Sequence, residues 1–182
     1  FKDAGNTATI GNLSGPASNA TGQLPGVATR RDAHGMTATI AGHYIHNVDR
    51  VQNNVEVYNT ATGARTSYDM NNGVCGAVAV TDDAGLPADD VAPDLMDRSP
   101  NGDFLFFAAR GPAPATVNHA AQGACPGVGV IAVQDSGASG ELVGVVRTSN
   151  TVDTAPAGTM AGGHAYTGAE RSDPHGVSVV IK

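Results

Sequence analysis

The stretch HGMTATIAGHYIHNVDR at residues 34–50 recurs in altered form, 60 residues later, as DLMDRSPNGDFLFFAAR at residues 94–110. The two copies align without a gap, with three identities and two matches in kind: Met36/Met96, Gly42/Gly102, Arg50/Arg110, Tyr44/Phe104 and Ile45/Leu105. A third start, DPHGV at residues 173–177, repeats DAHGM at residues 32–36. The chain is therefore built from a repeating unit, of which it holds about two and a half copies.

Each full copy predicts four short strands joined by tight turns. Residues 54–58 alternate apolar and polar side chains, as a strand with one buried face does. Residues 99–103 read SPNGD, a strong turn signal, and the apolar run at 104–109 predicts a buried strand. A fixed period of short strands is typical of β-propellers. We therefore predict an all-β propeller fragment with two full four-stranded blades and single strands of the flanking blades.

This architecture divides the chain into six segments. They are a lead-in loop with the outer strand of a preceding blade (1–32), a first full blade (33–70), an acidic connection (71–92), a second full blade (93–147) with an insertion at 110–127, a connection (148–172), and the inner strand of a third blade (173–182).

The composition suits turn-rich β structure. The 182 residues include 24 Gly and 10 Pro, only 4% are aromatic, and Trp is absent. A net charge of -7 argues against nucleic acid as a partner. No apolar run approaches the roughly 18–20 residues of a membrane span. Since residue 1 is Phe rather than Met, we expect a processed or partial chain.

Two cysteines and two sequons bear on the compartment. Cys75 and Cys125 lie in Gly/Pro-rich loop contexts, which favours a disulfide between them over two buried thiols. A disulfide implies an extracellular or periplasmic location. Asn12 and Asn19 begin triplets that permit N-glycosylation, although such triplets are common by chance.

Several strings resemble one family of propellers. They are YIHNVDRVQN at 44–53, DLMDRSPNG at 94–102, RGP at 110–112, HAAQG at 119–123 and DPHGV at 173–177. These residues resemble the YVTN/lactonase-like seven-bladed propellers, in particular the C-terminal part of a secreted, uncharacterised branch. The resemblance covers roughly residues 30–182 and implies the fold. It does not imply an activity, because this fold hosts enzymes, electron-transfer proteins and binding scaffolds. None of the lactonases' catalytic residues can be matched here.

The repeat alignment puts His34, Asp94 and His175 at the same place in three successive repeats. The starts of inner strands line one mouth of a propeller channel, so these side chains are expected to converge. Two imidazoles and a carboxylate are ligands for a divalent metal such as Zn, Cu or Fe. The alternative, which the sequence favours, is that they hydrogen-bond neighbouring backbone. His43 and His46 lie three apart on a strand and face opposite ways, so they do not share a metal.

An acidic stretch offers a second candidate site. Asp82, Asp83, Asp89 and Asp90 would suit Ca²⁺, but they lack the order of an EF-hand loop. A solvated acidic loop is the favoured interpretation.

These observations favour a binding or scaffold module of an extracytoplasmic propeller. The alternative is a metal-dependent propeller enzyme of lactonase or oxidoreductase type, acting at His34, Asp94 and His175. A third possibility is a structural subunit of a larger assembly. The expected partners are the remaining blades, supplied by another part of the precursor or by another chain.

Overall fold

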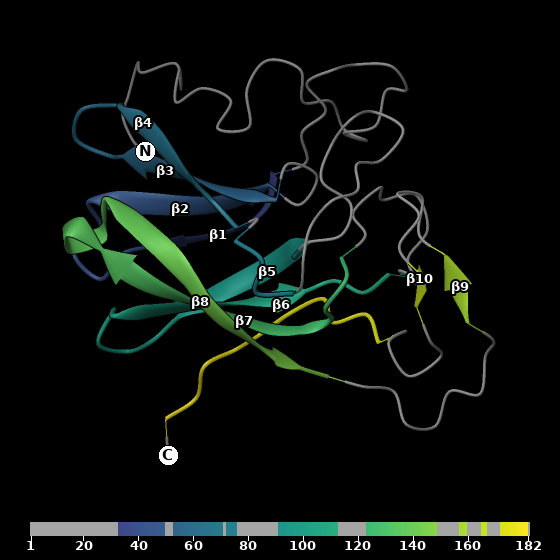
Figure 1. Cartoon of the computed structure of the whole chain (residues 1–182). Coiled ribbons are helices and arrows are strands. Elements are labelled where there is room, and N and C mark those ends of the chain that lie inside the picture. Colours follow the sequence, from purple (N-terminus) through teal and green to yellow (C-terminus); the bar gives the residue numbers. More distant parts are fainter. Residues whose placement is uncertain are drawn as a thin grey trace.

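Two four-stranded antiparallel sheets dominate the structure (Figure 1). The computed structural model describes residues 33–49, 53–70, 72–75, 91–112, 123–148, 157–159, 165–166 and 172–181. In the first sheet each strand pairs with the next along the chain: β1 (Ala33–Ala38), β2 (Tyr44–Asp49), β3 (Asn54–Asn59) and β4 (Arg65–Asp69). The second sheet repeats this order: β5 (Pro93–Arg98), β6 (Phe104–Ala109), β7 (Gly127–Gln134) and β8 (Ser139–Arg147). Each sheet has the strand order of a propeller blade, which confirms the predicted all-β fold of two full blades.

Three smaller elements complete the described structure. A 3-10 turn, η1 (Asp135–Gly137), joins β7 to β8. The strands β9 (Gly158–Thr159) and β10 (Ala165–Tyr166) pair within a segment for which we predicted only a connection. Over the ranges given above there is no α-helix, and thus no helix long and apolar enough to cross a membrane.

The two blades repeat the same backbone irregularity and the same turn. The register of β1 against β2 shifts between Ala33 and Met36, and that of β5 against β6 shifts between Pro93 and Met96. In the turns that follow, Gly42 and Gly102 have φ values of 68° and 81°, a left-handed conformation that favours glycine. The repeat in the sequence is thus a repeat of backbone geometry.

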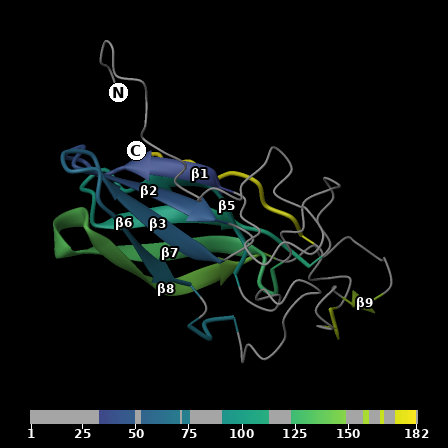
Figure 2. The same ribbon diagram turned by 90° about the horizontal axis from the view of Figure 1, so that it is seen from above.

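The core lies between the two blades. Strand β1 lies against β5, and β4 lies against β8, so the sheets face each other (Figures 1 and 2). Apolar side chains from both sheets, and from the segments beside them, fill the space: Val48, Val55, Met70, Val91, Met96, Leu105, Phe107, Ala109, Cys125, Ile131 and Leu142. Burial of this set is the main apolar contribution to stability.

Polar side chains also link the blades. His46 on β2 is fully buried, and its Nε2 donates to the carbonyl of Gly137 at 2.8 Å. Its Nδ1 lies 3.0 Å from the hydroxyl of Tyr68, which therefore donates to it. Arg98 on β5 donates to the carbonyl of Ala38 at 2.6 Å. These bonds satisfy groups that the contact between the blades removes from water.

A disulfide joins Cys75 to Cys125, with their Cα atoms 5.6 Å apart. The predicted pairing is confirmed. It ties the segment that leaves the first blade to the loop that enters β7. Arg147 at the end of β8 donates to the carbonyl of Cys75 at 3.1 Å, which holds the outer edge of the second blade to the same segment.

The last described segment differs from the prediction. We expected the inner strand of a third blade within residues 173–182, but residues 172–181 form no strand. The segment lies beside β5, where the amide of Leu95 donates to the carbonyl of His175 at 3.3 Å and the amide of Val179 donates to the Asp97 carboxylate at 2.9 Å. A strand needs a ladder of backbone bonds, and here the second bond goes to a side chain instead.

Candidate functional site

Four chain segments bring charged side chains together at one end of the blades. His34 and Asp94 lie near the beginnings of β1 and β5, and Arg110 follows the end of β6, which runs antiparallel to β5. Asp173 and His175 come from the segment beside β5. We call these five residues the charge cluster.

The centre of the charge cluster is a buried guanidinium held by two carboxylates. Arg110 is fully buried, and its Nη1 donates to Asp94 Oδ2 at 2.8 Å. Its Nε and Nη2 donate to Asp173 Oδ1 and Oδ2 at 2.5 and 2.9 Å, a bidentate pair. Burial lowers the pKa of Arg110, but the hydrogen bonds and charges of Asp173 and Asp94 outweigh burial and hold the pKa above its ordinary value. The guanidinium therefore stays charged.

Two imidazoles flank this centre and reach solvent. His34 Nε2 lies 2.9 Å from Asp94 Oδ1, and the His34 side chain is 34% exposed. His175 is 43% exposed, with Nδ1 at 3.4 Å from Asp94 Oδ2 and Nε2 at 3.4 Å from Asp173 Oδ2. Asp94 itself is fully buried, so it acts as a shared anchor for both rings.

A close approach of backbones makes this geometry possible. Gly35 follows His34 on β1, and a Cβ there would lie 2.8 Å from the Cα of Leu95. Any larger residue at position 35 would push β1 away from β5 and lift the His34 ring from the Asp94 carboxylate.

The structure brings the three predicted residues His34, Asp94 and His175 together, and it adds two that the sequence reasoning missed. Arg110 is identical to Arg50 in the repeat alignment, and Asp173 matches Asp32 in the third start of the repeat. The repeat thus carried a signal for both residues, but it gave no reason to pair them.

In the charge cluster as placed, the two carboxylates face a guanidinium rather than a metal ion. Asp94 and Asp173 already face a guanidinium, and a cation between them would meet its positive charge. In the part of the chain that the structure describes, no three His, Cys, Asp or Glu side chains form a group that would hold a metal. A metal at His34, Asp94 and His175 stays a prediction from the sequence.

The remaining predicted sites divide into two groups. His43 lies in the turn before β2 rather than on the strand where we expected it, and it is exposed, whereas His46 on β2 is buried. Asp82, Asp83, Asp89 and Asp90, together with the sequons at Asn12 and Asn19, lie outside the described residues.

What the charge cluster offers chemically is a pair of oriented imidazoles. A carboxylate beside an imidazole holds the ring in place. Since the His34 and His175 side chains are 34% and 43% exposed, a polar group of a ligand can reach each ring.

Solved structures of other proteins are similar to this chain. No protein-family model and no curated protein matches the sequence. A periplasmic gluconolactonase from Pseudomonas aeruginosa is 13% identical over 84% of this chain and 42% of its own, with a TM-score of 0.45. A protein from Lactobacillus plantarum is 15% identical over 74% and 33%, with a TM-score of 0.44. A candidate 6-phosphogluconolactonase from Bacteroides fragilis is 16% identical over 78% and 31%, with a TM-score of 0.39. The chain thus spans between 31% and 42% of the length of these proteins.

Proposed function

We propose that this chain is a binding module of an extracytoplasmic β-propeller, and that the charge cluster is its ligand site. The observation that carries the proposal is the pair of part-exposed imidazoles, His34 and His175, anchored on the fully buried Asp94. A ligand with hydroxyl, carbonyl or carboxyl groups is the chemical complement of such a pair.

The buried network explains how the imidazoles are kept ready for a ligand. Desolvating Arg110, Asp94 and Asp173 costs free energy that their mutual attraction repays only when the geometry is good. We therefore infer that these three residues serve mainly to orient the two imidazoles. Side chains that are already fixed lose less conformational entropy when a ligand binds.

Titration of the whole chain with small polyhydroxy acids and their lactones, followed by amide chemical shifts, tests the proposal. We expect shifts around His34 and His175, and weaker binding in the variant His34→Ala/His175→Ala. The matched control is His43→Ala, which removes an exposed imidazole far from the charge cluster. Binding that is unchanged by the double variant, or absent throughout the panel, contradicts the proposal.

A second candidate is an enzyme of lactonase or oxidoreductase type. The observation that favours it is the 2.9 Å distance between His34 Nε2 and Asp94 Oδ1, since an imidazole held by a carboxylate is a common general base. Lactone hydrolysis that is lost in His34→Ala would support this candidate. Stoichiometric transition metal in the purified protein would support its metal-dependent form, with His34, Asp94 and His175 as ligands.

The location and partners form part of the same proposal. The disulfide favours an oxidising compartment, hence the periplasm or the cell exterior. The second blade exposes Phe104 (39%), Val143 (52%) and Val146 (65%), apolar surface that a further blade would cover. We propose that those blades come from another part of the precursor or from another chain, as expected for the C-terminal part of a secreted propeller. The native mass, with the identity of any co-purifying chain, checks this.

A further inference from the structure

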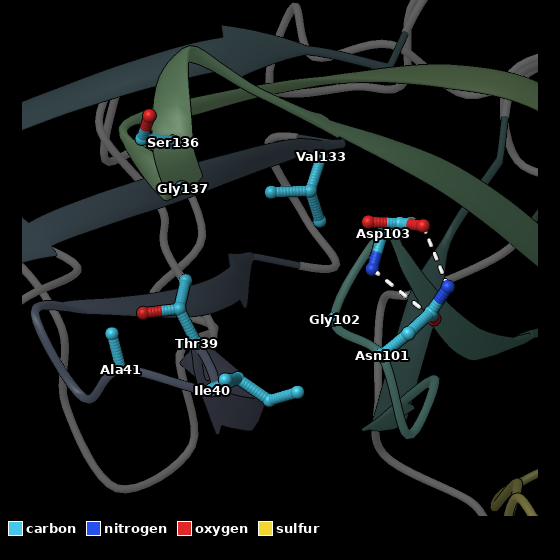
Figure 3. Close-up of a pocket in the computed structure, with 9 residues that line it drawn as sticks. All are labelled: Thr39, Ile40, Ala41, Asn101, Gly102, Asp103, Val133, Ser136 and Gly137. Carbon is cyan, nitrogen blue, oxygen red and sulfur yellow. Dashed lines mark hydrogen bonds between the residues drawn. The ribbon is translucent and has the colours of Figure 1, made fainter.

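A cavity of about 230 Å³ lies at the end of the blades away from the charge cluster. Three turns form its walls, those between β1 and β2, between β5 and β6, and between β7 and β8 (Figure 3). Because these walls belong to the two blades already within this chain, the cavity needs no other blade to form.

One side of the cavity presents an oriented carboxylate. Asn101 Nδ2 donates to Asp103 Oδ2 at 2.6 Å, and the two side chains stand together on one side in Figure 3. Asp103 is exposed, and the bond from Asn101 engages only its Oδ2. The hydroxyl of Ser136 lies across the cavity from this pair (Figure 3).

The rest of the wall is mainly aliphatic and carries no positive charge, and the Thr39 hydroxyl, which accepts a hydrogen bond from the amide of Tyr44, is its one further polar side-chain group. Ile40 is 52% exposed, and Ala41 and Val133 line the space beside it. Asp103 is the one charged residue among those that line the cavity, and no aromatic ring is among them. Arg98 does not line the cavity, and its guanidinium donates to the main-chain carbonyls of Ala38 and Thr39, at 2.6 and 3.2 Å.

We propose that this cavity binds a small aliphatic amine, with the ammonium on Asp103 and the hydrocarbon chain along Ile40 and Val133. The lone carboxylate selects a cation, and the aliphatic wall selects an alkyl chain. Ligand sites for drug-sized molecules measure roughly 300–1,000 Å³, so the smaller volume here selects a ligand of a few carbons. The absence of a cationic group among the lining residues disfavours carboxylates and phosphates, and the absence of an aromatic platform disfavours sugars.

Titration of the whole chain with butylammonium chloride, followed by amide chemical shifts, is the test. We expect shifts confined to the three turns around the cavity, with weaker binding as salt is raised, because salt screens the ion pair. Butanol and butyrate, which share the alkyl chain without the ammonium, are the matched probes and should not bind.

The variant Asp103→Asn should weaken butylammonium binding by about tenfold or more, because it removes the charge and keeps the shape. Glu141→Gln is the control, since Glu141 is an exposed carboxylate that bonds Gln134 and does not line the cavity. Equal binding to Asp103→Asn and the native chain overturns the proposal. So does binding of butanol or butyrate at the same place, or a lack of binding by butylammonium.

Discussion

Arg110 is the residue on which the charge cluster depends. Its guanidinium makes three hydrogen bonds to two carboxylates, and the side chain has no exposure to water. Removing it leaves Asp94 and Asp173 close together in a poorly solvated place. Removing a single partner from a buried ion pair typically costs more than the pair itself contributes.

We expect Arg110→Met to lower the free energy of unfolding by about 3–5 kcal/mol. Urea denaturation at neutral pH measures this change. The matched control is Arg147→Met, an exposed arginine whose loss should cost less than about 1 kcal/mol. Adding Asp94→Asn and Asp173→Asn to Arg110→Met should restore part of the stability. A small effect of Arg110→Met alone would contradict the assigned network.

His46 predicts a pH dependence of stability. Burial lowers its pKa from 6.5, and the hydrogen bond to Gly137 opposes this in part. Below pH 6.5 the unfolded chain therefore binds a proton that the folded chain resists, so stability falls as the pH falls through this range. Burial raises the pKa of Tyr68, the other partner of the ring, so its phenol stays neutral throughout.

We expect His46→Gln to flatten the loss of stability between about pH 7.5 and 5.5, by at most about 1.4 kcal/mol per pH unit. Comparison of urea midpoints across this range, in the native chain and the variant, isolates the contribution of His46 from those of other histidines. His43→Gln, which removes an exposed imidazole from the turn before β2, is the matched variant for comparison. An unchanged slope in His46→Gln would show that the buried ring does not control it.

At the scale of elements, the blades depend on turns of defined handedness. Gly42 follows β1 with a φ of 68°, and Gly102 occupies the equivalent turn of the second blade with a φ of 81°. A Cβ added at Gly42 would have no atom within 4 Å, so its cost would be conformational alone. Gly144 on β8 also has open space around it, but its φ is ordinary.

Gly42 and Gly144 form a matched pair for testing strain in the turn after β1. Gly42→Ala should destabilise the fold by about 1–2 kcal/mol, because an L-residue resists the left-handed region. Gly144→Ala should be neutral or stabilise by about 0.4–1 kcal/mol, through the loss of freedom in the unfolded chain. Thermal unfolding of the two variants checks the difference, and equal effects would contradict a left-handed residue at position 42.

At the scale of the whole molecule, the disulfide closes a long loop around the second blade. Cys75 and Cys125 are 50 residues apart, and this loop contains β5 and β6. In the chain-entropy model a loop of this length stabilises the fold by about 4 kcal/mol, by limiting the unfolded state.

We expect Cys75→Ser/Cys125→Ser to lower the free energy of unfolding by about 3–4 kcal/mol. Reduction of the native chain should cost a similar amount, whereas reductant should not affect the double variant. Urea denaturation with and without reductant makes the comparison. A reductant effect on the double variant would point to a cause other than this bond.

What the sequence determined by itself is what depends on neighbours along the chain. Period-two alternation, the apolar run at 104–109, and the turns at Gly42 and Gly102 together indicated the strands and their repeat. The repeat also related His34, Asp94 and His175, and loop chemistry indicated the pairing of Cys75 with Cys125. Each of these signals is local, or is repeated at a fixed period.

Only the tertiary structure decided how the two blades and the segment beside them meet. Arg110 reaches Asp173 across 63 residues of sequence, and His46 reaches Gly137 across 91. The cavity beside Asp103 likewise forms only where three turns come together. The segment after Asp173, which the repeat marked as a strand, forms none, because strand formation depends on a ladder partner and not on its own residues. Contacts of this kind follow from the packing of one sheet on another, which no local pattern encodes.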